Sequence, residues 1–410
     1  MRSPPWGHRS DMVDLSIRLL RDGYLAIGHD REVRHGAPTY PTRLLGHRAL
    51  VLSGRAGGQL FYDEDVVERA GVVPPPLARL LFGRGAIHGL DDEEHRARKQ
   101  MFLGLLTPDR VAPCATAVGE LLGEQLRGRV GTELALHPLL VETYGRTVLG
   151  WAGTEDDPGR AARLSRQYAR IVDGFGFAGR AYARGWAGRR RTDTWARALI
   201  RDVRHGRTTA PADTVLGTVA RSNLDDHTAA VELGNVLRPT IAVSWLGTFA
   251  AWQLDRTPQL RARLADPAAV AERLSFAQEV RRTSPFVPAL AGRVRKPTTH
   301  AGHDLRPGDL LVLDVRGINL DPELHPEPMV FRPDRFLGDT PGPFDLVPQG
   351  GGFPEGHRCP GESLALQVLQ ETLRVLAATD YDVVSRPGVD LRRMPTLPAD
   401  GLRLRIRSSP

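Results

Sequence analysis

The chain has 410 residues, of which 41% are hydrophobic and 25% charged, as in an ordinary globular protein with a sizeable core. Its 55 basic and 48 acidic residues give a net charge of +7, but the basic residues are scattered, and only Lys99 and Lys296 are lysines. A nucleic-acid module would cluster its charge, so we expect no nucleic-acid partner. The sequence has no run of 18 apolar residues and no apolar signal segment, which predicts a cytoplasmic protein without a membrane anchor.

The first predicted elements are short. The spacing of apolar residues predicts a helix over "DLSIRLLRDG" (14–23) and strands over "YLAIGHD" (24–30) and "ALVLSG" (49–54). From about Asp92 to Trp252 the pattern is mainly helical, and Asp91 is the expected N-cap of the helix that begins there. "GTEDDPGR" (153–160) interrupts this region, and the basic run "RGWAGRRR" (184–191) is expected to form a solvated loop.

A long apolar helix is predicted from Asn235 to Trp252, and it contains two residues that disagree with an apolar interior. Arg238 must find an anion or stay hydrated, since arginine remains protonated and is rarely buried unpaired. Pro239 lacks an N–H and clashes with the preceding turn, which predicts that the helix opens or kinks. The pair therefore indicates a functional site.

The remaining elements follow in order. We expect strands and turns over 285–306, a turn at "PGD" (307–309), a helix over "LALQVLQETLRVLA" (364–377) and a strand over "GLRLRIR" (401–407). The sum is a mostly helical protein with a small β portion. One large domain wrapped around an internal component is favoured.

The stretch "QGGGFPEGHRCPGE" (349–362) carries the strongest signal in the chain. Its glycines and prolines fold the backbone around Cys359, and the helix that follows points amide groups at the sulfur, which favours the thiolate. A nucleophile would need a partner base, for which His357 is poorly placed, and zinc would need further ligands. Axial ligation of a haem iron needs one thiolate only. The other cysteine is Cys114, and two cysteines are too few for a disulfide framework.

With this loop the chain resembles the cytochrome P450 superfamily. "EVRR" supplies Glu279 and Arg282 of the Glu-x-x-Arg motif, and "FRPDRF" supplies Arg335, which in that family completes a buried network behind the thiolate loop. The alternative for Glu279 and Arg282 is a plain helical ion pair. The resemblance implies the mainly α cytochrome P450 fold, a helical haem-enclosing domain with small β-sheets, and haem b with Cys359 as the axial ligand of the iron.

The chain is most similar to one branch, the bacterial fatty-acid peroxygenases and decarboxylases. "NVLRPTIAV" (235–243), "GHRCPGE" (356–362) and "RRMPTLPADG" (392–401) resemble that branch, and Arg-Pro within the long helix is its most specific feature. The resemblance implies a single haem domain over 13–410 behind an N-terminal extension over 1–12. It also implies the use of hydrogen peroxide to oxidise fatty acids at Cα or Cβ. "FPE" (353–355) is one residue shorter than the branch pattern.

Most of the superfamily has an acid and an alcohol where this chain has Arg238 and Pro239. The resemblance implies that Arg238 holds the substrate carboxylate, which then shuttles the proton needed to split hydrogen peroxide. Two alternatives are a haem propionate or a protein acid as the partner of Arg238. The hydroxyl of Thr240 is an alternative proton relay for dioxygen chemistry.

The resemblance also implies roles for residues around the cavity. His88 matches a histidine of decarboxylating members, so both terminal alkenes and hydroxy acids are expected, although a histidine that merely packs near the pocket is the alternative. Phe82 is expected beside haem and His88, and Phe286 and Val287 beside the substrate. The residues expected at the cofactor besides Cys359 are Arg69, His95, Lys99 and His357. Solvated charges and ordinary core packing are the competing interpretations.

Two other functions stay open at this stage. One is a monooxygenase of the same fold that acts on a different carboxylic acid and receives electrons from separate redox partners. The other is a haem-binding sensor or carrier without turnover. Activity with peroxide alone would separate the peroxygenase from both.

Overall fold

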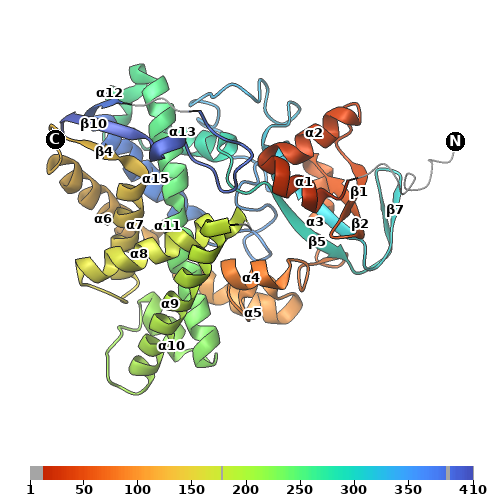
Figure 1. Cartoon of the computed structure of the whole chain (residues 1–410), viewed down its shortest axis with the longest axis horizontal. Helices are drawn as coiled ribbons and strands as arrows, with labels where there is room; N and C mark the ends of the chain where they lie inside the picture. The colour runs from red at the N-terminus through yellow and green to blue at the C-terminus, as the bar shows by residue number, and fades with distance from the viewer. Residues whose placement is uncertain (1–12, 177–178, 385–387, 410) are drawn as a thin grey trace.

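The computed structural model describes residues 13–176, 179–384 and 388–409 of the chain. The expected N-terminal extension, residues 1–12, lies outside the described residues. A helical part and a smaller part built on a β-sheet lie side by side in Figure 1, with α4 and α5 between them along the lower edge. The mostly helical fold with a small β portion is confirmed.

The α-helices of the described residues are α1 (Leu15–Asp22), α2 (Ala26–Val33), α3 (Gly54–Phe61), α4 (Pro75–Leu81), α5 (Asp92–Leu105), α6 (Pro108–Arg127), α7 (Leu136–Trp151), α8 (Pro158–Asp173), α9 (Gly179–Arg204), α10 (Val215–Arg221), α11 (Asp226–Arg256), α12 (Arg261–Ala265), α13 (Val270–Thr283), α14 (Val315–Asn319) and α15 (Glu362–Ala378). The short 3₁₀ helices are η1 (Gly23–Leu25), η2 (Ile87–Gly89), η3 (Gly174–Gly176), η4 (Pro258–Leu260) and η5 (Ala399–Gly401). The strands are β1 (Tyr40–Leu44), β2 (His47–Leu52), β3 (Val67–Glu68), β4 (Glu133–Ala135), β5 (Ala289–Val294), β6 (Thr298–His300), β7 (His303–Leu305), β8 (Leu310–Asp314), β9 (Asp380–Val383) and β10 (Arg403–Ser408).

Helix α11 forms the centre of the helical part and packs against α7, α9 and α15. Asp225 caps its first turn, since its carboxylate accepts from the backbone N–H of His227 at 2.8 Å and of Thr228 at 3.1 Å. The helix is buried on nearly every side from Ala229 to Ala251, which explains why most of its residues are apolar. It continues as one helix through Pro239. Arg238 is therefore part of an unbroken helix that α7, α9 and α15 surround.

The larger sheet has the strand order β1-β2-β8-β5-β3. β2 and β8 pair in parallel, with Ala49 opposite Leu310, whereas the other neighbouring strands are antiparallel. Along β2, Leu50 and Leu52 belong to one hydrophobic cluster and Ala49 and Val51 to another. The sheet therefore separates two small cores, because successive side chains of a strand point to opposite faces.

The expected strand over 24–30 is wrong, because these residues form η1 and α2. Tyr24, Ala26, Ile27 and Asp30 are buried, and this spacing is that of a helix face rather than of a strand. The strand over 49–54 and the helix over 14–23 are confirmed in β2 and α1, within two residues at either end.

The expected loop over 184–191 is also wrong, because this run lies inside α9. Gly185, Gly188, Arg189 and Thr192 are buried on one face of that helix. A Cβ at Gly188 would lie 2.6 Å from the carbonyl oxygen of Gln167, so the glycine allows α9 to approach α8 closely. Arg189 is only 3% exposed.

The C-terminal expectations are confirmed. β5, β6 and β7 fall within 285–306, the helix over 364–377 is part of α15, and the strand over 401–407 overlaps β10. Among the described residues, no helix is both long enough and apolar enough to cross a membrane.

Candidate active site

A cavity of about 750 Å³ lies between the two parts of the molecule. Its walls come from α11, the loop before α15, the segment from α4 to α5, and the strands β5 and β8. Cys359, Arg238, His88 and Phe286 all line it, although they are far apart in the sequence. The tertiary structure therefore brings the strongest sequence signals to one enclosed space.

The Cys359 loop closes on itself although it has one residue fewer than expected. The N–H of Cys359 donates to the carbonyl of Gln349 at 3.2 Å. Gly352 adopts a φ of +82°, and a Cβ there would lie 3.3 Å from the Tyr62 ring, so this turn requires glycine. Tyr62 thus packs directly against the loop.

Opposing influences act on the protonation of Cys359. Burial raises the pKa of the Cys359 thiol, whereas the N–H of Gly361 and the charge of Lys99 lower it. The loop thus contributes the effect that the sequence predicts, and burial acts against it. Burial in α6 raises the pKa of Cys114 to about 12, and this side chain does not line the cavity.

Lys99 holds the Cys359 loop from α5. Its ammonium donates to the carbonyl of Gly356 at 2.6 Å and to that of Arg358. The side chain is almost fully buried, and burial lowers the pKa of Lys99 to about 8. Two of its three N–H groups are therefore occupied by the loop.

His95 and His357 lie face to face, with ring centroids 3.9 Å apart. The Nε2 atom of His357 lies 3.4 Å from a carboxylate oxygen of Asp91. The Nδ1 atom of His95 is buried and has no hydrogen-bond partner among the described residues. Burial and the neighbouring His357 lower the pKa of His95 to about 3, so the ring is neutral at physiological pH.

Asp91 occupies the N-cap position of α5, as expected, and acidic residues fill the first turn. Its carboxylate makes no side-chain cap bond to α5 but accepts from the backbone N–H of Arg69 at 2.9 Å and of Ala70 at 2.8 Å. Asp91 thus ties the residues after β3 to the start of α5 and to His357.

Arg69 lies at the edge of this cluster. Its guanidinium carbon lies 3.7 Å from the centroid of the Phe61 ring, and Nη2 donates to the Phe61 carbonyl at 2.7 Å. Nη1 is buried with no partner in the described part of the chain. Burial lowers the pKa of Arg69 to about 10, so it keeps its positive charge at neutral pH.

Arg238 is 5% exposed and faces the cavity from α11. Its Nη2 donates to Oδ1 of Asn235 at 3.1 Å, whereas Nε is buried and unpartnered among the residues that the structure describes. Burial, followed by the nearby charge of Arg189, lowers the pKa of Arg238 to about 9. The guanidinium remains charged at neutral pH, and no described carboxylate forms an ion pair with it.

Phe82 and His88 lie beside Arg238. The rings of Phe82 and His88 stack with centroids 4.1 Å apart, and the guanidinium of Arg238 lies 5.7 Å from the Phe82 centroid. His88 lines the cavity, and the accessible part of its side chain faces that space. Desolvation by the surrounding protein, followed by the charge of Arg238, lowers the pKa of His88 to about 3.

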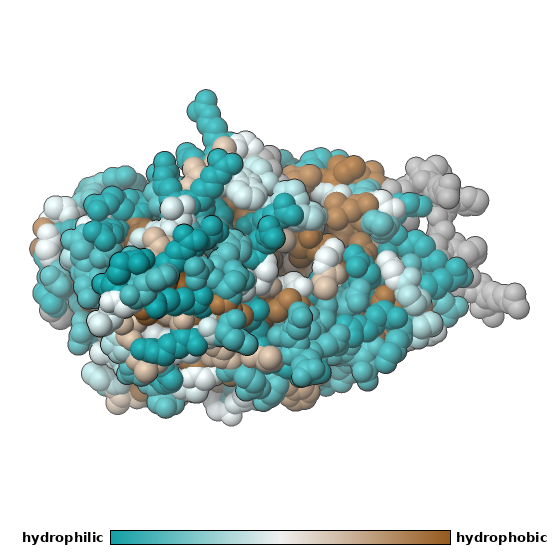
Figure 2. All heavy atoms as spheres, turned by 90° about the horizontal axis from the view of Figure 1, so that it is seen from below, coloured by the Kyte–Doolittle hydropathy of each residue, from teal (hydrophilic) through white to brown (hydrophobic). Residues whose placement is uncertain are grey.

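The other end of the cavity is apolar. Phe286 and Val287 line it, and the carbonyl of Phe286 accepts from the Tyr24 hydroxyl at 2.8 Å. Leu20 and Leu45 also line the cavity and are about half exposed, so the cavity reaches the surface between α1 and the β1–β2 turn. Figure 2 shows hydrophobic side chains gathered on one part of a largely hydrophilic face.

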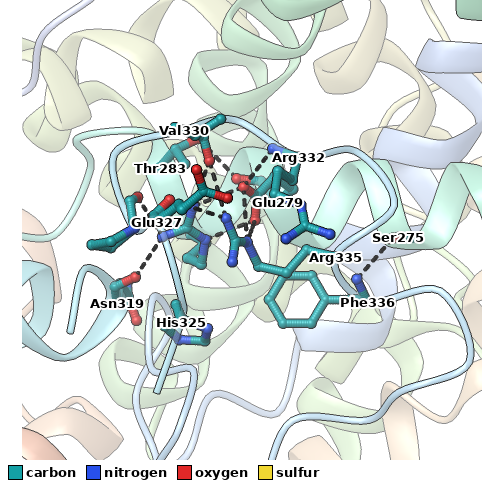
Figure 3. Close-up of polar contacts among 12 residues, drawn as sticks. Ser275, Glu279, Thr283, Asn319, His325, Glu327, Val330, Arg332, Arg335 and Phe336 are labelled. Carbon is teal, nitrogen blue, oxygen red and sulfur yellow. Dashed lines mark hydrogen bonds and ion pairs between the residues drawn. The ribbon is translucent and has the colours of Figure 1, made fainter. Parts of the chain in front are cut away.

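The Glu-x-x-Arg motif forms a buried network around Glu279 (Figure 3). Arg282 donates to both carboxylate oxygens of Glu279 at 2.7 Å, and Nε of Arg335 lies 3.1 Å from Oε2. Arg282 also donates to the backbone carbonyl of Asn319 at 2.9 Å. The side-chain oxygen Oδ1 of Asn319 accepts from the backbone N–H of Val347 at 2.9 Å. The network therefore connects α13 with the segment that enters the thiolate loop.

The structure adds residues that the sequence analysis missed. Arg281 donates to Glu362 at 2.7 Å, and Glu362 also accepts from Arg358 at 2.7 Å, which ties α13 to both sides of Cys359. Glu232 and Asn235 lie behind Arg238 on the same helix. The sequence could have indicated them, because positions 232, 235 and 238 are three residues apart and this spacing places their polar side chains on one face of an apolar helix.

The lining of the cavity fits a group that carries acids. Lys99, Arg238 and Arg358 line it, and none of the described lining residues is acidic. Nδ1 of His95, which lines the cavity, and Nη1 of Arg69, which does not belong to a lining residue, are both buried without a partner in the described part of the chain. A cofactor with carboxylates would fit the cationic side chains of this lining, and Cys359 would ligate its metal.

Comparisons with known proteins agree with this geometry. Residues 275–376 match the family model "Cytochrome P450". The putative cytochrome P450 138 of Mycobacterium tuberculosis (strain ATCC 25618 / H37Rv) is 26% identical over 379 residues, which cover 84% of this chain and 83% of that protein.

Two solved structures are similar over almost the whole chain. Cytochrome P450SP alpha (CYP152B1) in complex with (R)-ibuprofen is 34% identical, with a TM-score of 0.89 and coverage of 96% of this chain and 99% of that one. A variant of cytochrome P450 OleT in complex with arachidonic acid is 29% identical, with a TM-score of 0.91 and coverage of 97% of both chains.

Proposed function

Because the chain belongs to the cytochrome P450 family, in the branch that contains cytochrome P450SP alpha (CYP152B1), we propose that it is a haem-thiolate peroxygenase of fatty acids. It uses hydrogen peroxide to oxidise the substrate at Cα and Cβ. The observation that carries the proposal is the Arg238 guanidinium, which is buried, faces the Cys359 cavity and has no carboxylate partner among the described residues.

The cofactor is haem b. Cys359 is the residue that would ligate its iron, and the described residues near the Cys359 loop that would receive its acid groups are Arg69, His95, Lys99 and His357. When bound, haem supplies the oxidising iron centre. His95 offers a buried free nitrogen and Lys99 one N–H that the loop carbonyls do not use.

Arg238 orients the substrate. A fatty-acid carboxylate fits the guanidinium N–H groups that Asn235 does not use as a charge-assisted pair, and burial makes that pair strong and excludes water. The bound carboxylate then takes and returns the peroxide proton as a general acid–base. In most relatives of the superfamily a helical acid does this, and here the substrate brings the acid.

A fixed carboxylate also determines which carbons are oxidised. Cα and Cβ lie next to the anchored group, so they meet the oxidant before any carbon of the tail. Hydroxylation converts the acid and one H₂O₂ into a 2- or 3-hydroxy acid and one water. Decarboxylation converts R–CH₂–CH₂–COOH and one H₂O₂ into R–CH=CH₂, carbon dioxide and two waters. His88, held by Phe82 beside the Arg238 site, is the residue we assign to the choice between these products.

The long apolar end of the cavity supports an acyl chain as the substrate tail. The similar structure of a cytochrome P450 OleT variant contains arachidonic acid, which supports the same substrate class. The Thr240 hydroxyl donates to the Val236 carbonyl at 2.8 Å and can still accept a hydrogen bond, so activity with peroxide alone is the observation that separates the peroxygenase from the reductase-dependent alternative. The cytoplasmic location stays a prediction, as does the use of peroxide in place of electrons from separate redox partners.

The test is peroxide-driven turnover by Arg238→Ala. Removing one partner of a buried ion pair costs about 3–5 kcal/mol, so fatty-acid affinity should fall by roughly two to four decades and turnover should be lost. Arg55→Ala is the matched control, since Arg55 is exposed and pairs with Asp345, and neither residue lines the cavity. Near-normal turnover of fatty acids by Arg238→Ala, measured by gas chromatography of the products, would remove the proposed mechanism. The fatty alcohol of the same length should be inert with the unaltered enzyme.

A further inference from the structure

We propose that Glu232 is a positioning residue that holds Arg238 and His88 in register with each other. The proposal rests on the proposed function, because it concerns how the two residues act on one carboxylate. It starts from a contact that the sequence does not reveal: a fully buried glutamate of α11 reaches the segment η2, 145 positions away in the chain.

One oxygen of Glu232 holds the His88 side. Oε1 accepts from the backbone N–H of Ile87, the residue before His88, at 2.8 Å. The same oxygen accepts from Nη1 of Arg98 on α5 at 2.5 Å. A single carboxylate oxygen therefore fixes the backbone of η2 against α11 and α5.

The other oxygen of Glu232 acts on Arg238 through Asn235. Oε2 accepts from Nδ2 of Asn235 at 2.9 Å, and Oδ1 of Asn235 accepts from Nη2 of Arg238 at 3.1 Å. A carboxylate only accepts and a guanidinium only donates, so together they fix the orientation of the Asn235 amide between them. Asn235 thus holds Nη2 of Arg238, while the residue lines the cavity and its Nε is buried without a partner among the described residues.

The direction of this chain of hydrogen bonds gives a specific consequence. In Glu232→Gln one oxygen still accepts from Ile87 and Arg98, but an NH₂ group replaces Oε2 and faces the NH₂ of Asn235. If the Asn235 amide turns over to accept from it, its NH₂ then faces Nη2 of Arg238. The mismatch therefore moves along the chain to the guanidinium, although neither the volume nor the backbone changes.

The experiment compares fatty-acid binding and products in Glu232→Gln and in the unaltered holoenzyme. Affinity, measured by titration calorimetry with a saturated fatty acid, should fall about tenfold, which is the effect of one lost hydrogen bond to a charged group. The ratio of alkene to hydroxy acid should change severalfold, because the carboxylate and His88 lose their fixed relation.

The double variant Glu232→Gln/Asn235→Asp tests the direction of the chain. The amide introduced at position 232 can donate to the carboxylate introduced at position 235, and that carboxylate can accept from both of its neighbours. The product ratio should therefore return to that of the unaltered enzyme. Affinity is expected to stay lower, since the new carboxylate places a negative charge next to Arg238 and competes with the substrate. A merely structural role of Glu232 would not give this rescue.

Asp314→Asn is the matched control. Asp314 is also a buried carboxylate, and it pairs with Arg31 and accepts from the N–H of Gly317 at 2.8 Å, apart from Arg238 and His88. This variant should lose thermal stability while keeping the product ratio. If Asp314→Asn changes the ratio as much as Glu232→Gln does, the proposal is wrong.

Two further outcomes are decisive. An unchanged affinity and product ratio in folded Glu232→Gln would overturn the proposal. If Glu232→Gln fails to fold, Asn235→Leu interrupts the same chain and should reproduce both the affinity loss and the altered ratio. Failure of the proposed function has a different signature, because the unaltered enzyme would then neither bind fatty acids nor turn over with peroxide.

Discussion

Arg238 lies on a helix that is otherwise apolar on nearly every side, and the structure explains how it stays there without an ion pair. One nitrogen is bonded to a neutral amide of the same helix, and the guanidinium lies near the face of Phe82. Burial and the charge of Arg189 lower the pKa of Arg238 but leave it protonated at neutral pH. The residue is thus prepared for an anion that the described protein residues do not supply.

The first prediction concerns His88 and pH. Because its pKa is lowered to about 3, the folded protein holds the ring neutral above about pH 4. The ratio of alkene to hydroxy acid should therefore be flat from pH 5 to 8, whereas an unperturbed histidine would titrate near 6.5. Product analysis across this range checks it, with His88→Gln as the control that removes the imidazole. An inflection near pH 6.5 that disappears in His88→Gln would contradict the prediction.

At the scale of elements, polar side chains connect segments that the sequence pattern treats separately. Asp91 occupies the N-cap position of α5, but its carboxylate joins the residues after β3 to the Cys359 loop, and Glu279 joins α13 to the segment around Arg335. The local sequence pattern predicted that these two carboxylates form specific interactions. The partner of each one was set by packing, because a carboxylate with two oxygens can serve several donors.

The second prediction concerns the Glu279 network. Glu279→Gln leaves Arg282 and Arg335 without their shared charge inside the protein, which should lower the free energy of unfolding by about 3–5 kcal/mol. Urea denaturation measures the loss. Arg332→Ala is the matched control, since the Arg332 side chain is exposed and 3.7 Å from Asp334, and it should cost less than about 1 kcal/mol. Equal losses in the two variants would show that burial of the network is not what stabilises this region.

At the scale of the whole molecule, the cavity separates the helical core from the two clusters beside the sheet. Apolar and cationic side chains line this cavity of about 750 Å³. A ligand that binds there only in the folded state adds its own binding free energy to the stability of the fold.

The third prediction concerns removal of haem. The apoprotein should unfold at a lower temperature than the holoenzyme. Haem at a thousand times its Kd should raise the free energy of unfolding by about 4 kcal/mol. Hydrogen exchange should locate the loss in α5, η2 and the Cys359 loop, whose side chains line the cavity. The β9–β10 pair, none of whose residues lines the cavity, serves as the internal reference. Uniform loss of protection over the chain would contradict this assignment.

The sequence by itself determined the features that depend on neighbours along the chain. The Cys359 loop, the Glu-x-x-Arg spacing, Arg238 with Pro239 and the alternation in β2 all lie within short stretches, so their residue types indicate their local structure. The same local evidence failed over 24–30 and 184–191, where a helix and a short strand or loop share similar patterns and packing against other elements decides.

Only the tertiary structure decided which charges are balanced and which are left free. Glu232 accepts a hydrogen bond from Ile87, and Lys99 donates to carbonyls of the Cys359 loop. Arg238 forms no ion pair with an acid among the described residues. Burial, which is a property of the assembled fold, raises the pKa of Cys359 against the effect of its own loop. Hydrogen bonding and desolvation act through space, and the order of residues along the chain does not contain those distances.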